Sequence, residues 1–263
     1  KDLGTVKLDS SELPIVTIRT LGQQIPNEPK ISAKMEIRYN GEGSITHITD
    51  APNVYNGDIG IEVRGASSSG YPQTPYGLET RDSLGNNLDV SLLGMPEESD
   101  WILLSNYNDR SLIRNTLAQR LFADMGQYAP RQQLCEVMLD SVYKGIYVLS
   151  EKIKRDKNRV NIAKLNPEDA EGDDVSGGYI LQQNYWDPSN SFQSNFSPID
   201  HPEFDIHFVY EYPKPTDITA AQKEYIASFV DSLETALYSD DFADPDNGYR
   251  KYLGTKSFID YFL

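Results

Sequence analysis

The chain has 263 residues and a formal net charge of −16 at pH 7. This length can form one large domain or two small ones with a sizeable core. So acidic a surface repels phosphate backbones, which argues against a broad nucleic-acid-binding face. No apolar run approaches the roughly 20 residues of a membrane-spanning helix. Cys135 is the only cysteine, so an intrachain disulfide and a zinc cluster are excluded. Its neighbours alternate as in a strand and predict a buried thiol.

Residues 1–12 are polar and are expected to fray. After them, apolar residues alternate or cluster at strand spacing. The segments that this pattern predicts as strands are residues 13–19, 33–39, 59–64, 76–80, 101–105, 134–139, 145–153, 179–183 and 208–212. The two strands 134–139 and 145–153 are expected to form a hairpin around the turn 140–144. Residues 184–205 are rich in Asn, Ser, Asp and Pro and are predicted to be a loop.

The first predicted helix starts near Asp109 or Ser111, both good N-caps, and ends at Gly126. Its apolar stripe consists of Leu112, Ile113, Leu117, Leu121, Phe122 and Met125. Thr219 caps a second helix, and Gln222 is placed to close a capping box. The apolar face of this second helix consists of Ile226, Phe229, Val230, Leu233 and Leu237.

A third, short helix is predicted after Thr255 or Ser257, and a helix of this length is not stable alone in water. We expect it either to dock on the preceding domain or to continue into further chain. Residues 239–248 before it are predicted to be turns. Together the elements predict an α+β fold with mixed or antiparallel sheets and two or three helices.

A loop of small residues, 65–70, connects two of the predicted strands. It contains Gly65, Ser67, Ser68 and Ser69. Small residues let a phosphate approach the backbone, and loop N–H groups and hydroxyls can donate hydrogen bonds to it. An ordinary Gly/Ser hairpin connection is the alternative interpretation. No P-loop and no dinucleotide-binding glycine pattern is present.

A basic run stands out in this acidic chain; it consists of Lys152, Lys154, Arg155, Lys157 and Arg159. If residues 150–153 continue a strand, Glu151 faces one way and Lys152 and Lys154 face the other. An acid and a base at the lip of a sheet suit a metal–phosphate site. A solvated basic loop is the alternative.

Three further groups have simpler explanations than chemistry. Capping accounts for Asn108 and Asp109 at the strand-to-helix junction. Turns account for the Asp and His residues at 200–207 better than a metal cluster does. Residues 244–248 resemble a calcium loop only faintly, because the downstream bidentate acid is missing. No Ser-His-Asp arrangement has a local signature.

The order and spacing of five motifs resemble the CotH family of spore-coat-type atypical protein kinases, in a form found in secreted proteins of Bacteroidetes-type bacteria. The motifs occupy residues 59–87, 90–118, 128–139, 143–162 and 177–181. By this resemblance, residues 1–56 are a β-rich leader and residues 57–263 are a CotH-kinase-like domain that is incomplete at its C-terminus. The fold implied is the N-terminal portion of an atypical protein kinase.

The resemblance implies binding of ATP with Mg²⁺ and transfer of a phosphoryl group to Ser or Thr of a secreted or surface protein. Residues 65–70 would then act as the glycine-rich loop, and the helix from Asp109 to Met125 as the αC-like element. Glu151 and Lys152, with Lys154, would border the phosphates, and residues 179–183 would lead to the adenine-holding hinge. We also expect residues 65–70 and 151–154 to face one cleft.

Two departures from the family pattern matter. Family members usually carry a lysine where this chain has Thr74, and Gln73 supplies no charge either. The family's catalytic Asp and its Trp-Asp-x-Asp metal motif are expected beyond Leu263, so no catalytic residue and no metal ligand is assigned here. A non-catalytic extracellular binding or scaffold module, a pseudokinase, is therefore the alternative function. The resemblance further implies a secreted, periplasmic or cell-surface location.

Overall fold

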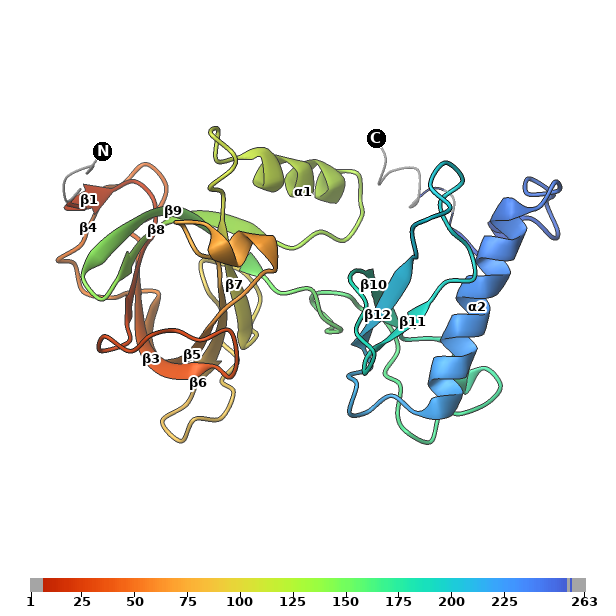
Figure 1. The fold of residues 1–263 in the computed structure, drawn as a ribbon. Helices are drawn as coiled ribbons and strands as arrows, with labels where there is room; N and C mark the ends of the chain where they lie inside the picture. Colours follow the sequence, from red (N-terminus) through yellow and green to blue (C-terminus); the bar gives the residue numbers. More distant parts are fainter. Residues whose placement is uncertain (1–6, 255, 257–263) are drawn as a thin grey trace. The chain divides into compact units, whose positions relative to one another are not determined.

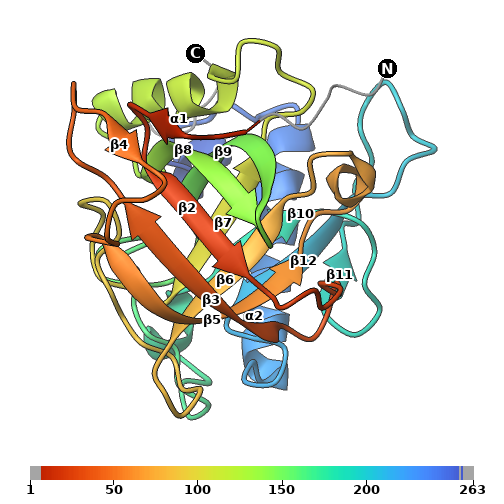
Figure 2. The same ribbon diagram turned by 90° about the vertical axis from the view of Figure 1, so that its left-hand side faces the viewer.

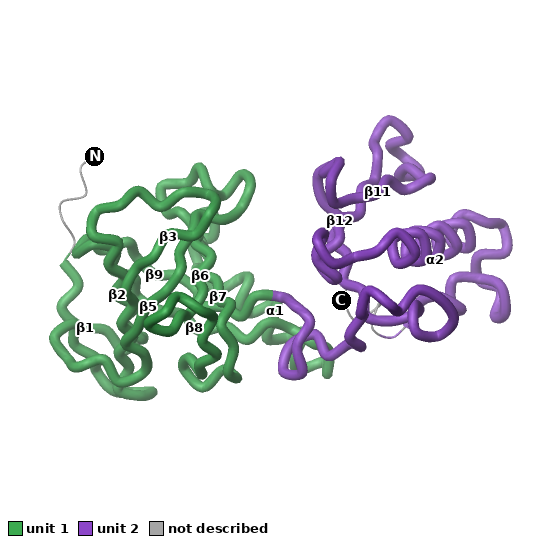
Figure 3. The backbone as a smooth tube through the Cα atoms, turned by 90° about the horizontal axis from the view of Figure 1, so that it is seen from below, with its two compact units in different colours: residues 1–152 green, residues 153–263 purple. Residues whose placement is uncertain are grey.

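The computed structural model describes residues 7–254 and residue 256. The chain divides into two compact units, residues 1–152 and residues 153–263 (Figure 3). The first unit is built mainly of strands, and the second combines a small sheet with a long helix (Figure 1). The predicted α+β class with antiparallel and mixed sheets is thereby confirmed. The predicted third helix lies outside the described residues, apart from Lys256.

The first unit is a closed barrel. Its strands are β2 (Ile15–Arg19), β3 (Ile31–Arg38), β5 (Tyr55–Val63), β6 (Tyr76–Arg81), β7 (Asp100–Ser105), β8 (Gln132–Leu139) and β9 (Val142–Glu151). They follow one another around the barrel in the order β2-β3-β5-β6-β7-β9-β8. Six of the seven pairings are antiparallel, and the parallel pair β2–β8 closes the ring from Ile15↔Glu136 to Ile18↔Leu139. Figure 2 shows β2, β3, β5 and β6 side by side on one wall.

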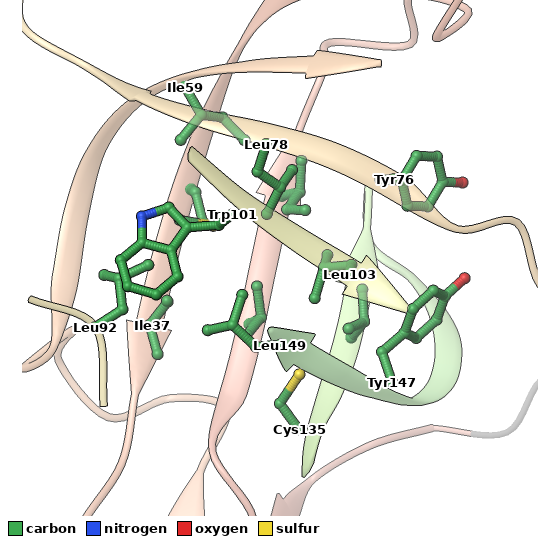
Figure 4. Close-up of a cluster of buried hydrophobic side chains, with 14 of the residues drawn as sticks. Ile37, Ile59, Tyr76, Leu78, Leu92, Trp101, Leu103, Cys135, Tyr147 and Leu149 are labelled. Carbon is green, nitrogen blue, oxygen red and sulfur yellow. The ribbon is translucent and has the colours of Figure 1, made fainter. Parts of the chain in front are cut away.

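Alternate side chains of these strands fill the barrel interior, as in other small barrels. Figure 4 shows Trp101, Leu103, Leu149 and Cys135 pointing into this core from β7, β9 and β8. The indole Nε1 of Trp101 donates to the carbonyl of Glu98 at 3.0 Å, so its polar atom is satisfied within the core. The interior is therefore a packed core that holds the loops at both ends in fixed positions.

The N-terminal leader is part of this barrel. Strands β2 and β3 lie between β8 and β5 in the barrel. Strands β1 (Ser10–Ser11) and β4 (Thr46–His47) pair in a separate two-stranded sheet. The expected boundary after residue 56 therefore does not coincide with the boundary between the compact units, which follows Lys152. The described residues of the 1–12 segment, predicted to fray, include this short strand.

The β8–β9 hairpin turns more tightly than predicted. Its strands pair as far as Leu139↔Val142, so the turn consists of Asp140 and Ser141 alone. Both residues have positive φ, 46° and 68°, which is the backbone that a two-residue hairpin turn requires. The carboxylate of Asp140 accepts a hydrogen bond from the backbone N–H of Thr20 at 2.7 Å, and this contact holds the turn against the end of β2.

Helix α1 (Arg114–Asp124) forms, but it begins later than predicted and its apolar stripe is not buried. Leu112 has a φ of 63°, so the backbone is not helical there. Ile113, Leu117 and Leu121 are 46%, 51% and 55% exposed, and no residue of α1 is buried. The helical periodicity of the sequence predicts this helix, but periodicity alone does not show which part of the protein covers the apolar face of a helix.

The second unit contains a three-stranded antiparallel sheet and one long helix. The sheet order is β10 (Ile180–Gln183), β12 (His207–Tyr212), β11 (Ser191–Gln193), and the helix is α2 (Ala220–Tyr238). Strand β11 lies inside the segment that was predicted to be loop; with three residues it is too short to give an alternating pattern. Short 3₁₀ turns occupy Asp174–Ser176 and Tyr249–Lys251.

The start of α2 confirms the predicted capping box. The Thr219 hydroxyl accepts from the backbone N–H of Gln222, and the Gln222 side chain accepts from that of Thr219. Gln222 also donates to the carbonyls of Asn166 at 2.7 Å and Asp169 at 3.1 Å, which ties the preceding loop to the helix. The buried cluster of this unit contains Tyr210, Ile218 and Ile226. No helix among the described residues is long and apolar enough to cross a membrane.

The native thiol of Cys135 is expected to resist alkylation and disulfide exchange. Its side chain is fully buried, and this burial raises its pKa to about 12, so almost no thiolate exists at pH 8. Ellman's reagent should react with one thiol per chain in denaturant and with almost none in the native protein. Rapid reaction of the folded protein at pH 8 would contradict this packing.

Candidate functional site

The serine loop, defined here as residues 64–75, leaves the barrel between β5 and β6. Its base is closed by a hydrogen bond from the N–H of Arg64 to the carbonyl of Pro75 at 3.1 Å. Within it, Ser67–Gly70 form one turn of 3₁₀ helix, η1. The loop is therefore an ordered structure in a fixed place, since its two ends continue the paired rung Val63↔Tyr76.

The small residues of the loop have different tasks. The Ser69 hydroxyl donates to the carbonyl of Ala66 at 2.6 Å and so closes the turn. Gly65 has a φ of +90°, and a Cβ at that position would lie 2.2 Å from Oγ of Ser68. Glycine is thus required at 65, both for the backbone conformation and for the space. Ser67 is exposed, so among the three hydroxyls its environment is the most open to a ligand.

The serine loop contacts the junction between β7 and α1. The rings of Tyr71 and Tyr107 stack with centroids 5.4 Å apart. The amide of Asn108 donates to the Tyr71 hydroxyl at 2.7 Å. Tyr107 and Asn108 follow Tyr71 by 36 and 37 positions in the chain, and no local sequence pattern predicts their contact with it.

Replacing Asn108 by alanine is expected to loosen this contact without unfolding the barrel. The side chain is exposed and its described partner is a single hydroxyl, so the cost in stability is about 1 kcal/mol or less. Hydrogen exchange of the amides of residues 66–71 should accelerate, while that of β8 stays unchanged. Unchanged exchange in the loop would show that Asn108 does not hold it.

Gln73 and Thr74 connect the serine loop to β9. The Gln73 amide nitrogen donates to the carbonyl of Ile146 at 2.9 Å, and its oxygen accepts from the Ser105 hydroxyl at 3.2 Å. The carbonyl of Thr74 accepts from the Tyr147 hydroxyl at 3.0 Å. At the two positions where the family pattern raised the question of a missing lysine, the side chain of Gln73 and the backbone carbonyl of Thr74 thus fix the loop to the barrel wall.

Asp109 organises the turn before α1. Its carboxylate accepts from the backbone N–H groups of Ser111 at 2.9 Å and Arg114 at 2.8 Å. Hydrogen bonds from the Ser111 hydroxyl and these N–H groups hold the pKa of Asp109 below its ordinary value. The capping prediction is therefore wrong: the helix begins at Arg114, Ile113 occupies the N-cap position without a side-chain cap, and Asp109 instead closes the turn before the helix, while Asn108 contacts Tyr71.

Glu151, the last residue of β9, has a fully buried side chain that pairs with Arg131. Its Oε1 accepts from a guanidinium nitrogen of Arg131 at 2.7 Å, and its Oε2 from the backbone N–H of the same residue at 2.9 Å. The strand ends there, so the alternation expected through residue 153 does not occur. In the described fold both oxygens of Glu151 hold the ends of β8 and β9 together.

The basic run that follows is folded on itself rather than extended. Arg155 donates to the carbonyl of Ile162 at 3.2 Å and lies over the ring of Tyr212, 5.7 Å from its centroid. Arg159 is buried. Lys152 belongs to the first compact unit and Lys154 to the second. Part of the basic run therefore builds the start of the second unit.

The described contacts join the serine loop to the β7–α1 junction and to the start of β9. The sheet register places Glu151 opposite Trp101, two residues before Leu103, which pairs with Tyr76 at the base of the loop. The two carboxylate oxygens of Glu151 bind Arg131, and a cleft shared by residues 65–70 and 151–154 remains a prediction.

The residues of the serine loop fit part of a nucleotide phosphate site. A glycine with positive φ and an exposed serine permit close approach of phosphate oxygens. The fit to Mg²⁺ is not established: within residues 7–254 and 256, no group of three or more His, Cys, Asp or Glu is placed to hold a metal.

The turn interpretation of residues 244–248 is confirmed, since the carboxylate of Asp244 accepts from the N–H groups of Asp246 and Asn247.

Comparison with known families identifies the relationship. The family described as CotH kinase protein matches residues 61–263. The chain belongs to the CotH family. No curated protein sequence matches it significantly. The match begins in β5, directly before the serine loop, and includes every residue of the candidate site, so the CotH resemblance of the sequence motifs is confirmed.

Proposed function

We propose that this CotH chain carries the nucleotide-binding part of a protein kinase that uses ATP with Mg²⁺. The phosphoryl acceptor would be Ser or Thr of a secreted or surface protein. The observation that carries the proposal is the ordered serine loop, which is held against the junction that leads into α1. The residues of this chain would bind and orient the phosphates. ATP itself supplies the phosphoryl group.

The order of elements supports this reading. Protein kinases place a glycine-rich loop over the phosphates, then a strand, then a helix that positions catalytic groups. In this chain the serine loop is followed by β6, β7 and α1 in that order, and the two tyrosines join the loop to the start of the helix segment. Gly65, Ser67 and the backbone of Ser68 and Ser69 are proposed to contact the phosphates.

A cation near the phosphates must come from somewhere other than position 74. The carbonyl of Lys144 accepts a hydrogen bond from Gln73 at 3.4 Å, so this lysine lies beside the serine loop in the fold. Its side chain is exposed. We propose Lys144 as a cation that takes over the missing charge, together with Lys152 and Lys154, which were singled out from the sequence.

One observation favours the second candidate, a non-catalytic binding module. Thr74 and Gln73 carry no charge where family members carry a lysine, and both carboxylate oxygens of Glu151 bind Arg131. A pseudokinase would keep the barrel and the loop and lose transfer. The two candidates differ in one measurable property, which is phosphoryl transfer.

The proposal is tested with radiolabelled ATP, Mg²⁺ and a Ser-rich acceptor. The protein encoded by the natural gene and residues 1–263 are assayed side by side. Transfer by the natural product, abolished by Gly65→Ala, supports the kinase. Binding of ATP without transfer by the natural product supports the binding module. Absence of both contradicts the proposed function.

Replacing Lys144 by glutamate should weaken ATP binding by about tenfold, because the charge near the phosphates reverses. Lys34→Glu is the matched control, because Lys34 pairs with Asp58 on the outer barrel wall. This variant should leave the affinity for ATP unchanged. Isothermal titration with ATP and Mg²⁺ measures both. Equal affinities for the two variants would remove Lys144 from the site.

We also propose that the protein is exported to the periplasm or cell surface. The acidity of the chain and its buried lone cysteine are compatible with this location. Fractionation of cells expressing the natural gene, with an antibody against the barrel, tests it. Recovery of the protein solely from the cytoplasm would contradict the proposal.

A further inference from the structure

A pocket lies within the second unit, at one end of its small sheet. Its volume is about 510 Å³, within the usual range for small-molecule sites. It forms where β10 ends and β12 begins, and its polar and aromatic lining residues are Gln183, Asn184, Tyr185, Trp186, Asp205 and His207. Gln183 is the last residue of the segment that the resemblance links to the adenine-holding hinge, and no lining residue belongs to the proposed phosphate contacts.

Two adjacent aromatic side chains stand out in this lining. Tyr185 is 76% exposed and Trp186 is 50% exposed. The indole of Trp186 lies against the imidazole of His207, with centroids 5.0 Å apart and planes tilted by 51°. One side of the ring is thus supported by β12 while much of it faces solvent. Large aromatic rings that are exposed and held in place are more common at binding surfaces than on the rest of the protein surface.

The backbone beneath these rings is fixed. The N–H of Asn184 donates to the carbonyl of His207 at 3.2 Å, which extends the β10–β12 pairing by one residue. The N–H of Tyr185 donates to the side-chain oxygen of Asn184 at 2.9 Å. After Trp186, the carboxylate of Asp187 accepts from the N–H of Ser189 at 3.0 Å and closes the turn. The aromatic pair is therefore presented by an ordered scaffold.

The charge around the pocket limits the ligand. Residues 165–213 contain ten Asp and Glu and no Lys or Arg. A phosphate or other anion would meet a repulsive field there. The lining contains two amides and one carboxylate, Asp205, which suit hydroxyl groups as hydrogen-bond partners. The described ring partner of Trp186 is the imidazole of His207, so one face of the indole is covered by a polar ring.

We propose that this pocket binds a neutral oligosaccharide. The apolar C–H face of a sugar ring would stack on Trp186, with Tyr185 extending the platform to the next ring. Adjacent sugar hydroxyls would donate to the carboxylate of Asp205 and accept from the amide of Gln183. Sugar binding at this pocket would not require ATP, so a CotH chain with this pocket would carry a glycan-binding surface in addition to its proposed phosphate site.

The test is isothermal titration of the whole chain with three neutral hexasaccharides, those of glucose, mannose and N-acetylglucosamine. At least one should bind with a submillimolar Kd. Trp186→Ala and Asp205→Ala should each weaken it at least about tenfold. Tyr185→Ala, in which an exposed ring is removed at little cost to packing, should weaken it as well. Phe242→Ala is the matched control, since Phe242 is also 50% exposed, and should leave the Kd unchanged.

Three results would overturn the proposal. The first is that none of the three sugars binds at millimolar concentration. The second is that a sugar binds equally well to wild-type, Trp186→Ala and Tyr185→Ala protein. The third is that a Lys-rich peptide, titrated in parallel, binds with a dependence on Trp186 and displaces the sugar, which would make the pocket a cation site. Gly65→Ala should not change sugar binding. Failure of the proposed nucleotide site is therefore distinguishable from failure of the sugar-binding proposal.

Discussion

Replacing Arg131 by alanine is expected to lower the free energy of unfolding of the barrel by about 3 kcal/mol. The Glu151 side chain is 0% exposed and that of Arg131 is 48% exposed. Without the guanidinium, the buried carboxylate keeps the backbone N–H of residue 131 as its described donor and loses its counter-charge. A buried charge without its partner is costly, because the protein interior does not replace the lost hydration.

Arg120→Ala is the matched control. Arg120 pairs with Asp124 on the surface of α1, and both side chains are more than half exposed, so its loss should cost no more than about 0.5 kcal/mol. Urea unfolding followed by the fluorescence of Trp101, in a Trp186→Phe background, reports on the barrel, because Trp101 lies opposite Glu151 in the β7–β9 pair. Equal midpoints for the two variants would show that the buried pair contributes little.

Replacing Gly65 by alanine should both strain the serine loop and weaken nucleotide binding by at least about tenfold. The φ of +90° disfavours any side chain, and the new Cβ would meet Oγ of Ser68 at 2.2 Å. The Ser68 hydroxyl can rotate away from the new methyl group, but the positive φ remains unfavourable for alanine, with a strain of about 1–3 kcal/mol. A loop whose backbone shifts to relieve this strain no longer presents the same N–H groups to a phosphate.

Gly70→Ala separates the effect of position from the effect of an added methyl. A Cβ on Gly70 has no neighbour within 4 Å, and its φ is not in the positive region. This variant should bind ATP with the affinity of the wild type. If both variants bind equally well, the phosphates do not lie against Gly65. If both lose binding equally, the requirement is for loop flexibility rather than for the geometry at Gly65.

The local features of this protein were readable from its sequence because neighbouring residues determine them. The capping box of Thr219 and Gln222 needs a spacing of three, and strand β3 shows alternating burial over much of its length. The burial of Cys135 followed from the same alternation. The family resemblance was readable as well, because it depends on the order and spacing of motifs along the chain.

The features that depend on distant residues were not readable. Barrel closure requires β2 to pair with β8 across more than 110 residues of chain, and no local pattern encodes that register. The stack of Tyr71 on Tyr107 and the burial of Glu151 against Arg131 arise from the same closure. The predicted role of Glu151 came from the alternation of side chains along a strand. This alternation shows which side of the sheet a carboxylate faces, but it does not reveal which partner the carboxylate binds.

Hydrogen exchange in the presence of ATP and Mg²⁺ tests the central claim, that nucleotide phosphates lie on the serine loop. The wild-type chain is compared with Gly65→Ala, with Mg²⁺ alone as the reference. The account predicts saturable protection of the amides of residues 64–75 and of the junction around Tyr107 and Asn108, both reduced in the variant. Saturable ATP binding that leaves residues 64–75 unprotected, or no ATP binding by the wild type, would contradict it.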